Sequence, residues 1–230
     1  MRWTAATPAR RRCLRDEIRE VLLARILEGS LRPGDRIVEL QLAREFRTSQ
    51  GPVREALREL EALRVLETTP FRGTRVRPVT PEEIAQAAEV RGLLEELAAR
   101  QLPRPEPGWL KRLARELDLL EDAARRGDLR SYARHNYNFH RRIVEAANNR
   151  PLLQAWEVLA IEVNTLLTLS RGHGTVQRVL REHRPILQAL QRGDRARAAR
   201  LLRKHARSVV QMVLAGRSAA AAQPDRVSEE

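Results

Sequence analysis

The sequence lacks the features that mark secreted and membrane proteins. Its 230 residues include a single cysteine, Cys13, so the chain cannot form an internal disulfide, which is typical of the reducing cytosol. No continuous run of about 18 apolar residues occurs, the length that a membrane span needs. Near the N-terminus, arginines stand where a signal peptide would have its apolar core. We therefore expect a cytoplasmic protein with no membrane partner.

Acidic residues are outnumbered by basic ones. The formal net charge is +13, from 43 Lys and Arg against 30 Asp and Glu. This balance favours a polyanionic partner, with nucleic acid first and an anionic membrane surface second. A generally basic surface is the alternative, because both halves of the chain carry positive charge. Charge thus suggests the kind of partner, and only a motif can locate its binding site.

Residues 14–78 have the order of elements found in a winged helix-turn-helix domain. Apolar residues at helical spacing predict helices at 14–28, at 38–46 and after the polar break 47–49, with Ser49 placed to cap the third. Beyond them, β-prone stretches on both sides of a Pro-Phe-Arg-Gly turn predict a two-stranded hairpin within 67–77.

The remainder of the chain predicts helices alone. Breaks at proline, glycine and asparagine separate six amphipathic segments, which we expect at 81–101, 107–126, 128–148, 151–170, 175–192 and 194–214. Thr80 is placed to cap the first of them. The predicted fold class is therefore mainly α, an N-terminal winged helix-turn-helix joined to a C-terminal six-helix antiparallel bundle. We expect domains at 14–78 and 79–214, with flexible tails at 1–13 and 215–230.

The third helix of the first domain is the candidate DNA reader. Its apolar stripe packs inward and leaves Gln50, Arg54 and Arg58 exposed. In helix-turn-helix proteins the N-terminal part of such a helix contacts base edges in the major groove. Glutamine and arginine are suited to bidentate contacts with adenine and guanine. A solvated charged helix face is the alternative for a helix taken by itself.

Two neighbouring segments extend this predicted surface. Arg47, Thr48 and Ser49 lie in the turn before the helix and suit contacts to phosphate at its N-terminus. Arg72 and Gly73 lie at the hairpin tip, where an arginine is drawn to the negative potential of a minor groove.

The same region resembles the DNA-binding half of the GntR family of bacterial regulators. The resemblance is carried by the run GDRIVELQLAREFRTSQGPVREALRELEALRVLETTPFRGTRVRPVT. It implies that Arg36, Arg47–Gln50, Arg54 and the wing residue Gly73 approach double-stranded operator DNA. Two departures stand out: Gln50-Gly51 replaces the usual Arg-Thr, and Arg47 stands where glycine is more common. The operator sequence of relatives therefore does not transfer to this chain.

Polar residues interrupt the apolar stripes of four predicted bundle helices. These residues are Arg91, Asn136, His140, His183 and His205. A single buried histidine is usually a satisfied core residue, but buried polar groups without partners are costly. Three histidines on three helices, with an amide and an arginine, therefore predict a bound group among them.

The residue types indicate what that group is. Imidazoles with a side-chain oxygen suit a divalent transition metal such as Zn²⁺, Ni²⁺ or Mn²⁺. Arg91 is suited to hold the carboxylate of a small effector bidentately. The alternative for Arg91 is a simple ion pair with Glu95, four residues further on.

Residues 81–214 resemble the helical ligand-binding (FCD) domain of the FadR-type branch of GntR regulators. The segments VRGLLEELAAR, NYNFHRRIVEAANNRPL and EHRPILQALQRGDRARAARLLRKHA carry the resemblance. Many members of that branch bind a metal through one Asp and three His and sense small organic acids. The matching positions here are Asn136, His140, His183 and His205, with Asn136 where Asp is commonest.

We interpret the chain as a homodimeric, metabolite-responsive and sequence-specific transcriptional regulator, and we favour a repressor over an activator. Two other classes are alternatives. A metal-dependent enzyme would need a free carboxylate base near the histidines, where the inward stripes offer only Glu95. A non-specific architectural DNA binder would bind operator and random duplex equally and ignore small acids.

Overall fold

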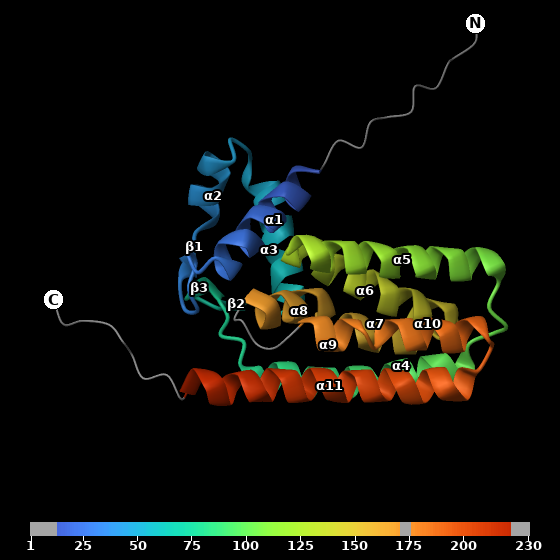
Figure 1. Cartoon of the computed structure of the whole chain (residues 1–230). Helices are drawn as coiled ribbons and strands as arrows, with labels where there is room; N and C mark the ends of the chain where they lie inside the picture. Colours follow the sequence, from blue (N-terminus) through green and yellow to red (C-terminus); the bar gives the residue numbers. More distant parts are fainter. Residues whose placement is uncertain (1–12, 171–175, 222–230) are drawn as a thin grey trace, which may run out of the picture. The chain divides into compact units, whose positions relative to one another are not determined.

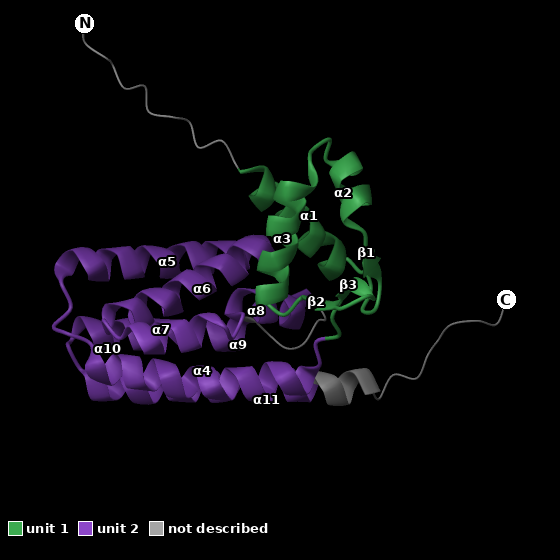
Figure 2. Ribbon diagram, turned by 180° about the vertical axis from the view of Figure 1, so that it is seen from behind, with its two compact units in different colours: residues 1–78 green, residues 79–230 purple. Residues whose placement is uncertain are grey.

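The computed structural model describes residues 13–170 and 176–221. The chain forms two compact units, residues 1–78 and 79–230 (Figure 2). The tail expected at 1–13 lies outside the described residues except for Cys13, and so does the end of the tail expected at 215–230.

Unit 1 is a winged helix-turn-helix (Figure 1). Its elements are α1 (Leu14–Leu27), β1 (Arg36–Ile37), α2 (Glu39–Glu45), α3 (Gln50–Ala62), β2 (Leu66–Thr69) and β3 (Gly73–Val76). The predicted apolar stripe of α3 is buried through Val53, Ala56, Leu57 and Leu60. The three strands form an antiparallel sheet in the order β1-β3-β2. The short strand β1 was not expected, because two residues give no alternating pattern from which a strand can be predicted.

The turn before α3 differs from expectation in one detail. Ser49 occupies the N-cap position, but its side chain makes no capping hydrogen bond. The capping role assigned to Ser49 is therefore wrong, and its hydroxyl stays exposed at the start of the helix. Arg47, two residues earlier, has a φ of 50°, in the left-handed region that favours glycine.

Unit 2 consists of helices in its described part. They are α4 (Pro81–Gln101), α5 (Pro107–Arg126), α6 (Leu129–Ala146), α7 (Arg150–Glu157), α8 (Ile161–Ser170), α9 (Val176–Leu180), α10 (His183–Gln191) and α11 (Arg195–Ala221). The Thr80 cap is confirmed, since its hydroxyl accepts a hydrogen bond from the Glu83 amide at 3.2 Å. Helices α4 and α11 lie side by side along one edge of the bundle (Figures 1 and 2). Leu113, Leu117, Phe139 and Ile143 are among the fully buried residues of the core.

Two helices that were expected to be continuous are each broken in two. The segment 151–170 breaks before α8, where Ala160 has a φ of 50° and the Asn164 amide donates to the Leu159 carbonyl at 2.9 Å. The segment 175–192 breaks between α9 and α10, where His183 Nδ1 lies 3.2 Å from the carbonyl oxygens of Val179 and Leu180 at the end of α9. Neither linking segment contains glycine or proline, but Pro185, in the first turn of α10, is a local signal for the second break. The last helix, expected to end at 214, continues to Ala221.

By length and composition alone, Arg150–Ser170 would be able to cross a membrane, the one such segment in the described residues. It is divided into α7 and α8, and 44% of its most apolar window is buried within the protein. Leu152, Trp156 and Ile161 belong to one apolar cluster with Ala98 and Val144 of neighbouring helices. The hydrophobicity of this segment is thus accounted for by packing in the bundle.

Candidate DNA interface and metal centre

On α3, the two residues closest to the expected base-reading position are held together. Arg54 donates from Nε to Glu39 Oε2 at 2.7 Å and from Nη2 to Gln50 Oε1 at 2.8 Å. Glu39 begins α2, so the ion pair ties the bracing helix to the reading helix. Arg54 is exposed, as is Arg58 one turn further along α3. Glu39 and Gln50 therefore fix one edge of the guanidinium.

The wing brings together predicted residues that are distant in sequence. Because β1 pairs with β3, Arg36 lies opposite Arg75 and next to Gly73. A Cβ on Gly73 would be 3.5 Å from Arg36 Nε, and the φ of Gly73 is +78°, which disfavours any other residue. Arg72 and Phe71 at the tip are exposed. Sequence reasoning did not single out Phe71, although a large apolar side chain in a turn was a visible signal.

In unit 2, three histidines from three helices converge. His140 of α6, His183 of α10 and His205 of α11 are all buried, and they offer ring nitrogens within 4.8 Å of one another. His140 Nε2 lies 3.2 Å from His183 Nε2, which lies 3.1 Å from Asn136 Oδ1. The four predicted ligand residues are thus brought to one place.

The Nδ1 atoms of His183 and His205 face hydrogen-bond acceptors. His183 Nδ1 lies 3.2 Å from the carbonyl oxygens of both Val179 and Leu180. His205 Nδ1 lies 3.1 Å from Glu182 Oε2. These partners place the N–H of each ring at Nδ1, which leaves the Nε2 lone pairs directed into the cluster. His205 Nε2 is buried and has no hydrogen-bond partner.

Glu95 supports the cluster from α4. One of its oxygens, Oε1, accepts from Arg91 Nε at 2.7 Å and from Trp156 Nε1 at 3.0 Å. The other, Oε2, lies 3.0 Å from His140 Nδ1, close enough for an ion pair but poorly aligned for a hydrogen bond. The pairing of Arg91 with Glu95 is therefore present, and it leaves Arg91 Nη2 buried without a hydrogen-bond partner.

Burial controls the protonation of these groups. It lowers the pKa of His140, and it lowers the pKa of His183 and His205 well below the ordinary value, with nearby positive charge adding to the effect. Burial alone would raise the pKa of Glu95, but Arg91 and His140 outweigh it and hold that pKa far below its usual range. Neutral imidazoles beside a charged carboxylate are the protonation states that a metal ligand set requires.

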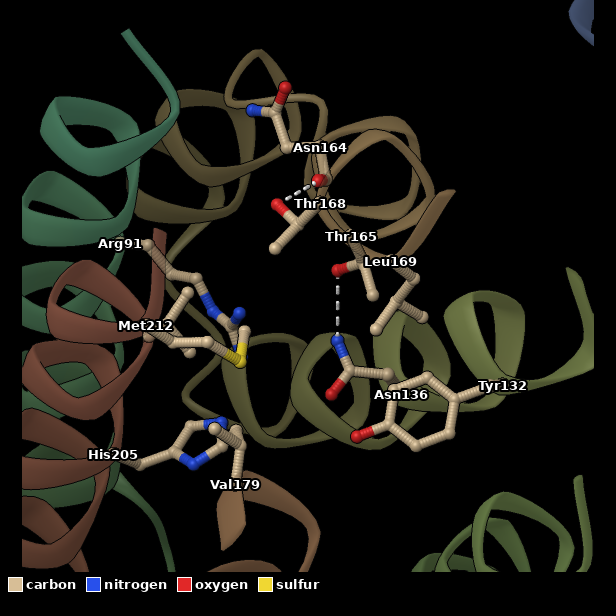
Figure 3. Close-up of a pocket in the computed structure, with 11 residues that line it drawn as sticks. Arg91, Tyr132, Asn136, Asn164, Thr165, Thr168, Leu169, Val179, His205 and Met212 are labelled. Atoms are coloured by element: carbon tan, nitrogen blue, oxygen red, sulfur yellow. Dashed lines mark hydrogen bonds between the residues drawn. The ribbon is translucent and has the colours of Figure 1, made fainter. Parts of the chain in front are cut away.

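A pocket opens beside the cluster. Figure 3 shows Arg91, Asn136 and His205 directed toward the same space from α4, α6 and α11. Across from them α8 supplies Asn164, Thr165 and Thr168, and the Asn136 amide donates to the Thr165 hydroxyl at 3.4 Å. The remaining lining residues are Tyr132, Leu169, Val179, Val209 and Met212.

Some of these residues were missed from the sequence. The face of α8 was hidden because a continuous helix was expected over 151–170. Glu182, which holds His205, precedes its helix rather than lying on its buried stripe. The Ser208 hydroxyl donates to Glu182 at 2.7 Å. Glu182 also begins the segment EHRPILQ, which carries part of the family resemblance, and this was the signal for it in the sequence.

The arrangement fits a divalent cation. His183 Nε2 lies 3.2 Å from His140 Nε2 and 3.1 Å from Asn136 Oδ1 in a buried space, and His205 Nε2 has no hydrogen-bond partner. With the N–H of His183 at Nδ1, the lone pair on its Nε2 faces the Asn136 oxygen, an arrangement that a cation between them would stabilise. Three imidazoles and one oxygen form a donor set for a transition metal.

Comparison with known proteins gives independent information on both units. The family described as bacterial regulatory proteins, gntR family, matches residues 14–76, and the FCD domain matches residues 86–208. A probable D-xylose utilization operon transcriptional repressor of Paenarthrobacter nicotinovorans is 35% identical over 189 residues, covering 82% of this chain and 84% of its own length. The gluconate operon transcriptional repressor of Bacillus subtilis (strain 168) is 27% identical over 183 residues, covering 76% of this chain and 74% of its own length.

Solved structures share the fold. E. coli McbR/YncC aligns with a TM-score of 0.71 at 23% identity, covering 88% of this chain and 97% of that one. A GntR family transcriptional regulator from Pseudomonas syringae pv. tomato str. DC3000 aligns with a TM-score of 0.53 at 30% identity, covering 91% of this chain and 88% of that one.

Proposed function

The chain belongs to the GntR family of bacterial regulators with a C-terminal FCD domain, and from that premise we propose that it is a cytoplasmic repressor that a small carboxylic acid releases from its operator. As a member of this family it is a DNA-binding transcriptional regulator and not an enzyme. Glu95, the one carboxylate considered as a catalytic base, is engaged by Arg91, His140 and Trp156.

We propose that unit 1 contacts operator DNA through nine residues. Those residues are Arg36, Arg47, Thr48, Ser49, Gln50, Arg54, Arg58, Arg72 and Gly73. The turn and wing residues contact phosphate or the minor groove, while Gln50 and Arg54 contact bases. Two such units in a homodimer would match the two halves of a near-palindromic operator.

The convergence of His140, His183 and His205 carries the proposal for the sensor. These residues and Asn136 would hold a divalent metal such as Zn²⁺, Ni²⁺ or Mn²⁺, which when bound supplies positive charge and open coordination positions for an anion. Arg91 adds a donor from the protein, because its unpartnered Nη2 belongs to a side chain that lines the same pocket.

The other side of the pocket suggests the effector class. Asn164, Thr165 and Thr168 provide polar atoms opposite Arg91, as would suit hydroxyl groups on the acid. Two relatives are named for the D-xylose and gluconate operons, and sugar acids carry both a carboxylate and hydroxyls. We therefore propose a hydroxylated carboxylic acid as the effector.

A thermal-unfolding experiment tests the sensor. Protein treated with a chelator should unfold at a lower temperature than protein with added Zn²⁺, Ni²⁺ or Mn²⁺. A hydroxy acid at about 100 times its dissociation constant should add roughly 2.7 kcal/mol of stability, a rise of about 5–10 °C. A metal-free protein whose unfolding temperature no metal and no acid changes would contradict the proposal.

A pair of histidine substitutions on α6 gives the matched control. His140→Ala should remove bound metal in elemental analysis, because it deletes a ligand. His135 lies on the same helix, but its ring contacts Glu116 rather than the cluster. The variant His135→Ala should therefore leave the metal content unchanged. Equal metal content in the two variants would place the metal elsewhere.

A further inference from the structure

Phe71, at the tip of the wing, is fully exposed. Its accessible fraction is 108%, whereas the next most exposed large apolar side chain in the described part of the chain, Val158, has 62%. A single exposed apolar residue is ordinary in a soluble protein. A phenylalanine ring that extends entirely into water, however, forgoes all the free energy that burial would give it. The ring is therefore available to a partner that covers the wing.

The backbone of Phe71 is strained as well. Residues 69–72 form a four-residue turn, closed by a hydrogen bond from the Arg72 amide to the Thr69 carbonyl at 3.1 Å. Pro70 occupies the second position, and Phe71 occupies the third with a φ of 64°. A positive φ at the third position favours glycine or asparagine, because a larger side chain is crowded there. The turn thus has phenylalanine where its backbone favours a smaller residue.

The hairpin, and not the ring, holds this turn in place. Strands β2 and β3 pair as far as Thr69 and Gly73, and the hydroxyl oxygens of Thr68 and Thr74 lie 3.0 Å apart. The fully exposed ring of Phe71 contributes no packing to the fold. Strain and exposure therefore coincide at a side chain that the fold does not use, which is a reason to look for a function.

We propose that Phe71 is a wedge, a side chain that enters the minor groove of the operator, inserts its ring between two base pairs and bends the DNA. The proposal rests on the contact between wing and DNA proposed above, and it adds to that contact a stacking residue and a bend. Minor-groove proteins insert apolar side chains, phenylalanine among them, in this way and kink the duplex by roughly 20–90°.

The charges around the tip favour DNA as the partner. Arg72 follows the ring in the turn and is exposed. Arg36 of β1 pairs with Arg75 and lies against Gly73. The one acidic residue of the hairpin, Glu67, lies opposite Arg75 rather than at the tip. An apolar tip on a basic hairpin matches a groove that has stacked bases at its floor and phosphates along its rims.

A wedge at this position would select operators by their flexibility. Pyrimidine–purine steps such as TA are easily unstacked, so a duplex with such a step under each wing should bind more tightly than one without it. This preference needs no hydrogen bond to a base edge. Phe71 is thus a specificity-determining residue that acts through the deformability of the DNA.

Substitutions in the turn separate the ring from the backbone. Phe71→Asn removes the ring and suits a positive φ, so it should raise the unfolding temperature by about 2–8 °C and weaken operator affinity by roughly 5–150-fold. The slope of log affinity against log salt should stay unchanged, because no charge is lost. Arg72→Gln, one residue away, should instead lower that slope by about 0.9. Phe71→Trp keeps an aromatic ring and should keep most of the affinity.

Two optical measurements follow the DNA itself, on a duplex selected from random sequences. Energy transfer between dyes at the duplex ends should show a bend with the wild type and Phe71→Trp, and a nearly straight duplex with Phe71→Asn. 2-Aminopurine placed at successive positions should brighten where the ring unstacks it. Val158→Asn is the control, because it removes the next most exposed apolar side chain, which lies at the end of α7 in unit 2. It should leave affinity and bend unchanged.

Three outcomes overturn the wedge. They are a Phe71→Asn protein that binds and bends the duplex like the wild type, a Phe71→Trp protein that behaves like Phe71→Asn, and a fall in unfolding temperature in Phe71→Asn with DNA binding unchanged. The last of these would place the ring against protein rather than DNA. If Phe71→Asn does not fold, Phe71→Gly replaces it with the same expectations.

Failure of the wedge is distinguishable from failure of the DNA reader. A wild type that binds selected and random duplexes equally at fixed salt would overturn the DNA contacts proposed above. A wild type that discriminates between them but leaves the selected duplex straight and stacked would overturn the wedge alone.

Discussion

At the scale of single residues, Glu39 places a carboxylate on the surface that we propose contacts DNA, where its charge would repel phosphate. Its exposed ion pair with Arg54 adds little stability, since such pairs contribute roughly 0–1 kcal/mol. Its effect is on orientation: with Nε on Glu39 and one Nη2 hydrogen on Gln50, Arg54 turns Nη1 and the other Nη2 hydrogen outward. That edge is a fork for the O6 and N7 atoms of guanine.

Glu39→Gln should therefore change two quantities in opposite directions. Non-specific DNA affinity should rise because a negative charge is lost, while discrimination at the base pair contacted by Arg54 should fall about tenfold, within the roughly 1–3 kcal/mol of one bidentate contact. Selection from random duplexes followed by competition at fixed salt measures both. Glu55→Gln removes the same charge from an exposed position of α3 and should leave discrimination intact. Wild-type discrimination in Glu39→Gln would show that Arg54 needs no such support.

Arg47 combines backbone strain with a positive charge. Its φ of 50° costs a residue with a side chain roughly 1–2 kcal/mol relative to glycine. Arg47→Gly should therefore raise the unfolding temperature of the protein by about 2–8 °C. If the guanidinium contacts phosphate, the slope of log affinity against log salt should fall by about 0.9. A variant with lower stability and an unchanged salt slope would contradict both assignments.

At the scale of elements, Glu116 joins α5 to α6. It accepts from Arg142 Nη2 at 2.9 Å and lies 2.9 Å from His135 Nδ1. Burial alone would raise its pKa, but the bonds from His135 and Arg142 lower it. Because the folded pKa lies below the unfolded one, Glu116 stabilises the fold above the unfolded pKa of about 4.3, and that stability is lost as pH falls through the folded value.

Glu116→Gln should consequently lower the free energy of unfolding by about 1–3 kcal/mol at pH 7 and flatten its decline in acid. Denaturant titrations in chelator from pH 7 to about pH 3 measure this. Asp118→Asn, on the same helix at a carboxylate that is 71% exposed and only 3.9 Å from Arg184, is the control and should follow the wild-type curve. Parallel curves for Glu116→Gln and wild type would contradict the assignment.

The spacing of apolar residues correctly predicted those elements whose ends are marked by proline or glycine. The α3 stripe, the hairpin and helices α4 to α6 were predicted because apolar spacing, prolines and Gly127 mark them in the sequence. The breaks near Ala160 and before His183 were not predicted, although Pro185 stands in the first turn of α10. At each break a polar side chain, Asn164 or His183, lies within hydrogen-bond distance of carbonyls three to five residues earlier in the chain. In the site, inward-facing polar residues on helical stripes were visible, whereas Glu182 lies off its helix stripe.

At the scale of the whole molecule, the central claim is that an acid bound in unit 2 controls DNA binding by unit 1. Fluorescence anisotropy on a selected duplex at fixed salt, with metal-loaded protein and an acid that raises its unfolding temperature, measures this coupling. The account predicts that saturating acid weakens operator affinity by about 5–150-fold and that a chelator abolishes the acid's effect. An acid that stabilises the protein but leaves operator affinity unchanged would contradict it.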